Sequence, residues 1–332
     1  MKTEILEFTG NMLPEAGKLL AERHVRNRQA LPLLPARFED LQIATQAITE
    51  LWKTKLKNGY AAFRDGKMVA YLIGENSTQP WGRSGYVYLP GYALAEGESP
   101  ALLQDLYALL GEDWVKKGCF NHYLYVSAAD AAILNALFDI GFGKERVDAL
   151  LDLNSAELPN VDEPKNRIIR QASEGDAMLL GNFSNVIMRA LGDAPYWHPT
   201  MPEDWDDLYE GWSELAADKE WTVWLALDGP QALGMIGFRP EAEAPTQMLV
   251  APSTVYLSVA ATHPAARGRG VSTELTQHGL AHARAAGYKV CYTNWISPNF
   301  LASRFWPRFG FQDVAYRVAK KVSPMIAWAK EE

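Results

Sequence analysis

One stretch decides the fold of this chain. It runs from His263 to Thr273 and reads His-Pro-Ala-Ala-Arg-Gly-Arg-Gly-Val-Ser-Thr. The residues before it, Thr254–Ala261, are apolar and partly β-branched, which predicts a buried strand. After it, apolar residues recur at helical spacing up to Gly287, where a helix is expected to end. The stretch is therefore predicted to be a loop that leads from a strand into a helix.

Such a junction suits an anion. The first N–H groups of a helix have no partner inside the helix and carry part of its positive dipole. Gly268 and Gly270 allow close approach and a positive φ, and Arg267 and Arg269 add fixed positive charge. The pattern favours a pyrophosphate site. The alternative interpretation is an exposed basic turn that only joins two elements.

The residues that follow favour the pyrophosphate site over the exposed turn. Tyr288–Trp295 predicts the next strand, and Asn299, Ala302, Trp306 and Gly310-Phe311 come after it. In this order and spacing the chain resembles the GNAT N-acetyltransferase superfamily. The acyl-CoA loop of that family is Arg/Gln-x-x-Gly-x-Gly/Ala, which corresponds to Arg267-x-x-Gly270-x-Ser272 here. The later signature of an Asn, an Ala three residues on and an aromatic-x-x-x-Gly-Phe end matches as well.

The resemblance implies an α+β fold with a mixed, largely antiparallel sheet that splays between its fourth and fifth strands and has helices on both faces. It also implies an acyl-CoA site, whose expected residues are Ala260, Ala261, Thr262, Arg267, Gly268, Arg269, Gly270, Val271, Ser272, Thr273, Asn299 and Trp306. Trp306 departs from the family, which usually has a tyrosine there as the acid for the departing thiolate. An indole N–H does not give up its proton at physiological pH.

Composition excludes several classes of protein. The chain has 332 residues, 48% of them hydrophobic and 22% charged, which is typical of a globular protein. No apolar run is long enough for a membrane span, and the N-terminus does not resemble a signal peptide. Cys119 and Cys291 lack metal-ligand spacing. The net charge of −8 argues against general nucleic-acid affinity. We expect a cytoplasmic monomer or homodimer that binds no metal.

The two halves of the sequence resemble each other. Gly118 and Gly141 are 23 residues apart and flank a predicted strand, and Gly287 and Gly310 repeat this arrangement. Self-similarity of this kind indicates a duplicated unit. We therefore expect a GNAT-like domain over residues 1–153, a linker over 154–164 that contains two prolines, and a second domain over 165–332.

The first copy lacks the anion loop. Its corresponding segment, Leu94–Pro100, contains Glu96 and Glu98 in place of the arginines. These carboxylates would repel a pyrophosphate, so we expect this copy to keep the fold without binding CoA.

The catalytic groups are not fixed by the sequence. The predicted fourth strand has no carboxylate, which leaves Tyr256 and His198 as weak candidates for proton relay through water and Asn294 as a weak candidate for contact with the thioester end. Trp197 and Trp295 are candidates for contact with the acceptor. No nucleophile motif is present, so direct transfer in a ternary complex is favoured over an acyl-enzyme.

The expected activity is transfer of an acetyl group from acetyl-CoA, or another acyl-CoA, to a small-molecule or peptide amine. The alternative is a non-catalytic acyl-CoA-binding module, which the presence of Trp306 in place of the usual tyrosine supports. No nucleic-acid or membrane partner is expected.

Overall fold

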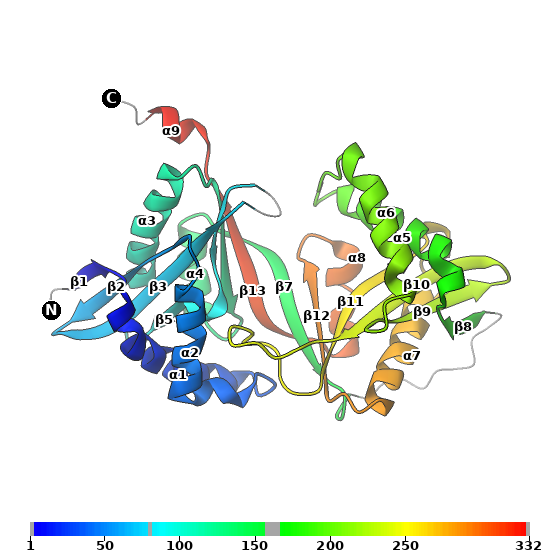
Figure 1. The fold of residues 1–332 in the computed structure, drawn as a ribbon, viewed down its shortest axis with the longest axis horizontal. Coiled ribbons are helices and arrows are strands. Elements are labelled where there is room, and N and C mark those ends of the chain that lie inside the picture. The colour runs from blue at the N-terminus through cyan, green and yellow to red at the C-terminus, as the bar shows by residue number, and fades with distance from the viewer. Residues whose placement is uncertain (1–2, 79–81, 157–166, 330–332) are drawn as a thin grey trace. The chain divides into compact units, whose positions relative to one another are not determined.

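The computed structural model describes residues 3–78, 82–156 and 167–329. Residues 157–164 of the expected linker lie outside this part of the chain. The described chain divides into two compact units, shown in Figure 1. Unit 1 comprises residues 1–148, 243–250 and 313–332, and unit 2 comprises 149–242 and 251–312. No helix in the described ranges is both long enough and apolar enough to cross a membrane.

Unit 1 is a sheet with helices on both faces. Its helices are α1 (Leu13–Ala30), α2 (Leu41–Trp52), α3 (Ala101–Lys116), α4 (Ala131–Asp139) and α9 (Met325–Ala329). Its strands are β1 (Glu4–Glu7), β2 (Lys57–Arg64), β3 (Lys67–Ser77), β4 (Ser84–Val87), β5 (Tyr92–Leu94), β6 (Asn121–Ser127), β13 (Gln312–Lys321) and the first part of β7 (Gly143–Asp152). The strand order is β1-β2-β3-β4-β6-β13, with β5 paired to β3.

The core of unit 1 forms where α3 covers this sheet. Trp114 is fully buried and packs with Leu72 and Leu124. Its ring requires glycine beneath it, because a Cβ on Gly85 would lie 2.3 Å from the ring. On the opposite face of the sheet, Tyr71 contacts Phe8 at a ring-centroid distance of 6.0 Å.

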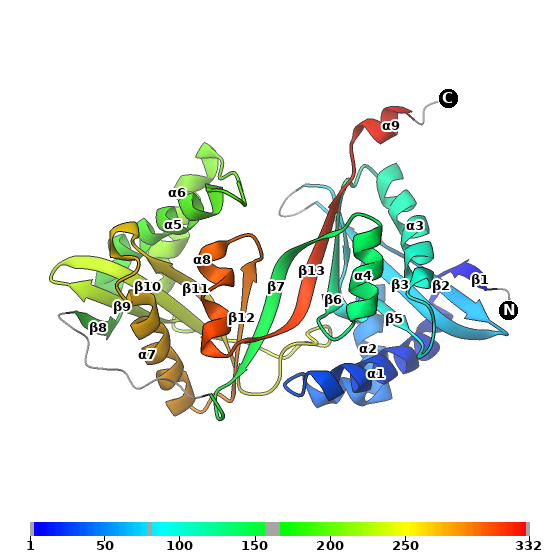
Figure 2. The ribbon, with the colours of Figure 1, turned by 180° about the vertical axis from the view of Figure 1, so that it is seen from behind.

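Two segments from late in the sequence belong to unit 1. Strand β13 pairs antiparallel with β6, from Ala315–Ser127 to Lys321–Asn121, and the two strands are visible side by side in Figure 2. The second segment is residues 243–250. Arg37, which lies between α1 and α2, donates hydrogen bonds to the backbone carbonyls of Ala244 and Gln247 in this segment. The consecutive division expected from the sequence therefore differs from the structure in these segments, because strand pairing depends on contacts distant in sequence.

Unit 2 repeats the architecture with a different set of loops. Its strands are β8 (Ile168–Gln171), β9 (Thr222–Asp228), β10 (Gln231–Pro240), β11 (Thr254–Thr262) and β12 (Val290–Ile296), in the order β12-β11-β10-β9-β8. Its helices are α5 (Ala177–Gly192), α6 (Trp205–Ser213), α7 (Val271–Ala285) and α8 (Phe300–Ser303). The expected mixed, largely antiparallel α+β fold is confirmed: β11 and β12 are parallel, whereas β8 to β11 pair antiparallel.

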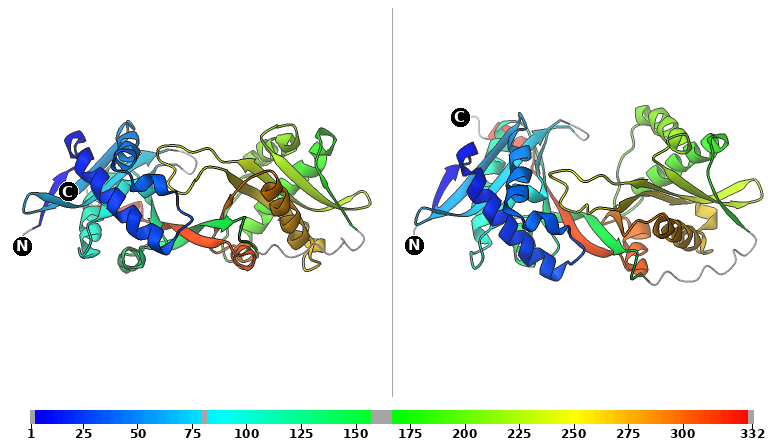
Figure 3. Two further views of the ribbon diagram at one scale, coloured as in Figure 1. Left: turned by 90° about the horizontal axis from the view of Figure 1, so that it is seen from below. Right: turned by 60° about the horizontal axis from the view of Figure 1, so that its bottom comes forward.

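Helices α5 and α7 cover opposite faces of this sheet, as the right panel of Figure 3 shows. On one face, Leu180 and Phe183 of α5 pack with Leu225. On the other face, the ring of His278 on α7 lies 4.2 Å from that of Trp224. Alternate residues of a strand point to opposite faces, so Trp224 packs against α7 and its neighbour Leu225 packs against α5.

A buried histidine makes the stability of unit 1 depend on pH. His122 accepts a hydrogen bond from Tyr107 Oη at Nδ1 (2.8 Å) and donates from Nε2 to the carbonyl of Cys119 (3.0 Å). Burial lowers its pKa to about 4. Between that value and the ordinary 6.5, the unfolded chain binds the proton and the folded chain does not, so stability falls as pH falls.

We predict that His122 lowers the free energy of unfolding by about 3 kcal/mol between pH 7 and pH 4. Urea unfolding across this range would measure the slope, and His122→Asn should remove this part of it. An NMR titration that placed the His122 ring near its ordinary pKa in the folded protein would contradict the prediction.

Candidate functional site

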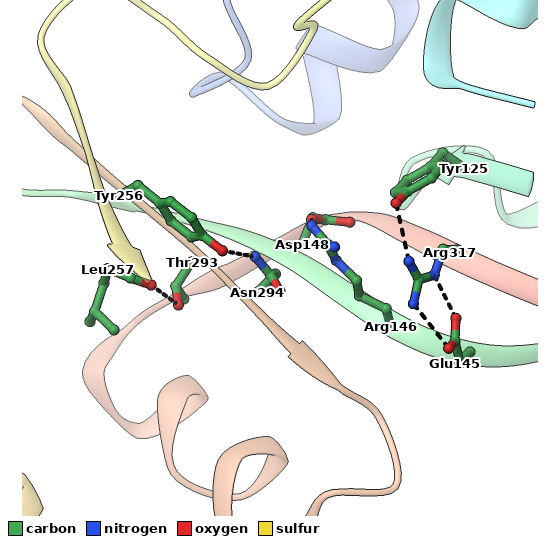
Figure 4. Close-up of polar contacts among 9 residues, drawn as sticks. All are labelled: Tyr125, Glu145, Arg146, Asp148, Tyr256, Leu257, Thr293, Asn294 and Arg317. Atoms are coloured by element: carbon green, nitrogen blue, oxygen red, sulfur yellow. Dashed lines mark hydrogen bonds and ion pairs between the residues drawn. The ribbon is translucent and has the colours of Figure 1, made fainter. Parts of the chain in front are cut away.

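Strands β11 and β12 form a fork. Their pairing begins at Thr254–Val290 and its last pair is Leu257–Thr293, although both strands continue. At this last pair the Thr293 hydroxyl donates to the carbonyl of Leu257 (2.9 Å), as drawn in Figure 4. A side chain thus satisfies a buried backbone acceptor where the strands separate.

The edge of β11 beyond the fork is open. Its other edge pairs with β10, and a register shift between Gly237 and Phe238 leaves Ser258 as an extra residue on β11. A bulge of this kind bends a strand and re-aims its side chains. From Ser258 to Thr262, the edge that faces away from β10 has no partner strand among the described residues. Unpaired strand edges offer backbone donors and acceptors to an extended ligand.

The loop after β11 presents backbone donors. Gly268 and Gly270 have φ of +75° and +82°, a region that only glycine enters without strain. Gly270 is the N-cap of α7, and the first helical hydrogen bond is from Glu274 N to Gly270 O (3.0 Å). Within the described residues, no N–H from Gly268 to Thr273 donates to a protein acceptor. The loop therefore offers several free amides at the positive end of a helix.

Strand end and helix start are tied together. The hydroxyls of Thr262 and Ser272 lie 2.5 Å apart, which links the last residue of β11 to the first turn of α7. This contact restrains the two ends of the loop that presents the amides.

A cavity of about 600 Å³ connects the fork and the loop within unit 2. Its walls come from α5, β10, β11, the loop, the start of α7, β12 and α8. On the α5 side, Val186, Ile187, Ala190 and Leu191 form an apolar stripe. Arg267 and Arg308 are the charged residues of the described lining. An elongated ligand with an anionic end and an uncharged end fits these walls.

Comparison with known proteins identifies the fold and a family match over part of unit 2. Residues 187–311 match the sequence model of the acetyltransferase (GNAT) family. A GCN5-related N-acetyltransferase from Sphaerobacter thermophilus has a similar structure, with a TM-score of 0.59 at 15% identity over 96% of this chain and 95% of the other. A tandem GNAT protein from the clavulanic acid biosynthesis pathway gives 0.51 at 12% identity over 97% and 99%. Residues 187–311 are therefore similar to the GNAT family, and the whole chain shares the fold of these two solved structures.

A third solved structure supports the same fold. A glucosamine N-acetyltransferase region of a fungal multi-domain beta-N-acetylglucosaminidase superposes with a TM-score of 0.58 at 13% identity, over 96% of this chain and 38% of that one. No curated protein matches the sequence of this chain. The similarities therefore establish the fold, and the activity has to be argued from the residues.

The structure brings together most of the residues that the GNAT resemblance implied. The residues of this set that line the cavity are Ala260, Ala261, Thr262, Arg267, Gly268, Gly270, Val271, Ser272, Thr273, Asn299 and Trp306. Arg269 is absent from the described lining. Trp306 is buried, 6% exposed, and packs edge-on against Phe305 and Phe311.

Only one of the two tryptophans expected at the acceptor end is among the described residues that line the cavity. Trp295 on β12 is buried and lines the cavity. Trp197 is 69% exposed and is absent from the described lining. His198 follows it in the loop after α5, where its ring packs against Tyr196 at 5.4 Å, and it is not among the lining residues described.

Tyr256 and Asn294 lie together. Asn294 lines the cavity, and its Nδ2 donates to Tyr256 Oη over 2.6 Å (Figure 4). The Tyr256 ring lies 5.0 Å from that of Tyr292, and the Arg239 guanidinium lies 5.1 Å from it. The Tyr256 hydroxyl is thus one hydrogen bond behind the cavity wall.

The cavity wall itself offers little acid–base chemistry. Its described lining contains no Asp, Glu, His, Lys, Cys or Tyr. Cys291 is fully buried on β12, and burial raises the pKa of its thiol, which disfavours a nucleophilic thiolate. In the described ranges, no group of three or more His, Cys, Asp or Glu side chains is placed to hold a metal ion.

Sequence reasoning missed Thr293 and the α5 stripe. A threonine within a strand carries no signal of a strand fork. The stripe was readable in principle, because 186, 187, 190 and 191 are spaced to share one face of a helix.

Proposed function

We propose that this protein transfers an acyl group, in the first instance acetyl, from acyl-CoA to the amine of a small molecule or peptide. The observation that carries the proposal is the single cavity that joins an open strand edge to a set of free, preorganised amides. The amides of the loop residues 268–273 would bind the diphosphate, with Arg267 as a nearby charge. The open edge of β11 would pair with the pantetheine arm.

In the proposed reaction both substrates are bound at once. The amine nitrogen attacks the thioester carbonyl, a C–N bond forms and the C–S bond breaks. The nitrogen loses one proton and the CoA sulfur gains one. Holding the two reactants in line supplies much of the rate. Free N–H groups at the β11 bulge would stabilise the charge that develops on the carbonyl oxygen.

Tyr256 is the proposed proton carrier. It is a titratable side chain whose hydroxyl is held by a cavity-lining residue, Asn294. Trp306 occupies the position of the family's usual tyrosine and is buried against aromatic rings, so the acid must come from elsewhere. Through water, Tyr256 would give its proton to the sulfur and recover the one released by the nitrogen.

Unit 1 is proposed not to bind CoA, because its own fork is filled. The pairing of β4 with β6 ends at Val87–Leu124, and the chain then turns into β5. Arg23 enters from α1 and donates to the carbonyls of Leu89 and Tyr92. The cavity lined by Arg23 measures only about 10 Å³, against about 600 Å³ in unit 2.

The acidic loop of unit 1 is engaged in an internal ion pair. Glu98 forms an ion pair with Arg64, with N–O distances of 2.5 and 2.7 Å. Both side chains of this loop contact are thus already paired within unit 1.

We predict that CoA binds with a stoichiometry of one per chain and that Gly270→Glu abolishes binding. The substitution places a carboxylate among the loop amides, where it would repel the diphosphate. Its matched control is Gly270→Gln, which imposes the same backbone strain at positive φ without the charge. Isothermal titration calorimetry would measure both. Equal affinities for the two variants would exclude the loop as the phosphate site, and two CoA per chain would show that unit 1 also binds.

The enzyme and the non-catalytic module make different predictions. The absence of a titratable group other than arginine in the described cavity lining is the observation that favours the module. We expect a panel of amines incubated with acetyl-CoA to include at least one that releases free thiol and gains an acetyl mass. Tight CoA binding with no thiol released by any amine would favour the module.

For an amine that reacts, Tyr256→Phe should lower kcat by about 100-fold, since it removes the proposed proton carrier together with the acceptor of the Asn294 hydrogen bond, and should leave the CoA Kd unchanged. Tyr292→Phe is the matched control, because it removes a hydroxyl from the neighbouring ring. Steady-state kinetics would compare them. If both variants lost the same small factor, Tyr256 would have no role in proton transfer.

A further inference from the structure

A row of three side chains crosses the sheet of unit 2 one residue pair before the fork. Arg239 on β10 is the cross-strand partner of Tyr256 on β11, and Tyr256 is in turn the partner of Tyr292 on β12. Directly opposite residues of neighbouring strands point to the same face of a sheet. The Arg239 guanidinium lies 5.1 Å from the centroid of the Tyr256 ring, and the Tyr292 ring lies 5.0 Å from it. The ring of the proposed proton carrier thus has a cation on one neighbouring strand and a second ring on the other.

The cation of this row is held by a carboxylate. Nη2 of Arg239 lies 3.2 Å from Oε2 of Glu241, whose side chain is 15% exposed. The backbone N–H of Glu241 donates to the carbonyl of Thr254 (3.1 Å), so the carboxylate is anchored to the same two strands, β10 and β11, as the row. An arginine stays protonated at every physiological pH. The position beside the Tyr256 ring therefore carries a permanent positive charge.

Unit 1 contains the same row with the charge reversed. Tyr86 on β4 and Tyr123 on β6 are cross-strand partners, and their rings lie 4.9 Å apart. The residue of β3 that is paired with Tyr86 is Glu75. Burial raises the pKa of Tyr86 to about 12. The copy that is proposed not to bind CoA therefore keeps both rings, but it has a carboxylate at the position that Arg239 occupies in unit 2.

We propose that Arg239 is a positioning residue for proton transfer, which holds the Tyr256 ring beside Asn294 and stabilises the negative charge that develops on it. The inference rests on the proposed function, since it requires Tyr256 to be the proton carrier. Arg239 does not line the described cavity, so it acts through Tyr256 and not on the substrates.

The charge arises in the middle of the proposed reaction. When the C–S bond breaks, Tyr256 gives its O–H proton to the CoA sulfur through water, and its oxygen keeps a negative charge. The oxygen then takes up the proton that the amine nitrogen releases. The face of an aromatic ring attracts a cation, and this attraction increases when the ring carries a negative charge. Arg239 therefore favours the intermediate stage of the transfer over the resting state.

The first test varies the charge at residue 239. We expect Arg239→Gln to lower kcat by about 10-fold and Arg239→Glu, which reproduces the charge of unit 1, to lower it by about 100-fold. Arg239→Lys keeps the charge and should remain within about threefold of the wild type. The KM of both substrates and the CoA Kd should not change in any of the three variants. The matched control is Arg189→Gln, which removes an exposed arginine of α5 outside the described cavity lining and should leave kcat unchanged.

The second test asks whether Arg239 acts through the Tyr256 hydroxyl. In the Tyr256→Phe background, Arg239→Gln should have no further effect on kcat, because the charge that Arg239 stabilises no longer forms. An equal loss of kcat in the two backgrounds, or a kcat that does not depend on the charge at residue 239, would overturn the inference. A wild-type protein that releases no thiol with any amine would instead refute the proposed function.

Discussion

The site of unit 2 depends on one buried hydrogen bond, from Thr293 Oγ1 to the carbonyl of Leu257. It lies at the last paired position of two parallel strands, so a side chain takes over from the backbone ladder there. A sheet that continued beyond this point would fill the cavity with its own hydrogen bonds. Because the ladder stops, β11 keeps an unused edge, and the same strand delivers the chain into the loop before α7. The open edge thus follows from the interruption of strand pairing, and the free amides follow from the start of α7 directly after the same strand.

The loop was predictable because its chemistry is local. The glycines at 268 and 270 predict positive φ angles, and both residues have positive φ in the structure. The fold class was predictable from the family pattern over about 60 residues. Other features could not be read from the sequence, since they depend on contacts distant along the chain. Strand β13 could pair with any open edge, and nothing in its sequence selects β6.

The two copies show how a duplicated fold can diverge without losing its frame. In unit 2, the space beyond the fork is lined by small and apolar residues such as Ala260 and Ala261. In unit 1, Arg23 and Tyr92 occupy the corresponding position, with the guanidinium 4.0 Å from the ring. Tyr92 in turn donates to Asp130 and accepts from the N–H of Ser127. The backbone groups that a fork leaves unpaired are satisfied internally in one copy and left open in the other.

The place of β13 in the sheet of unit 1 has a consequence for biosynthesis. Residues 312–321 leave the ribosome after the strands and helices of unit 2, yet they pair with β6, which emerges almost 200 residues earlier. Until then, one edge of β6 has no β13 to pair with, and exposed strand edges invite pairing with other chains. Unit 1, most of which is synthesised first, is therefore completed only after unit 2. A chain truncated before residue 312 would lack β13 and leave unit 1 without one of its strands.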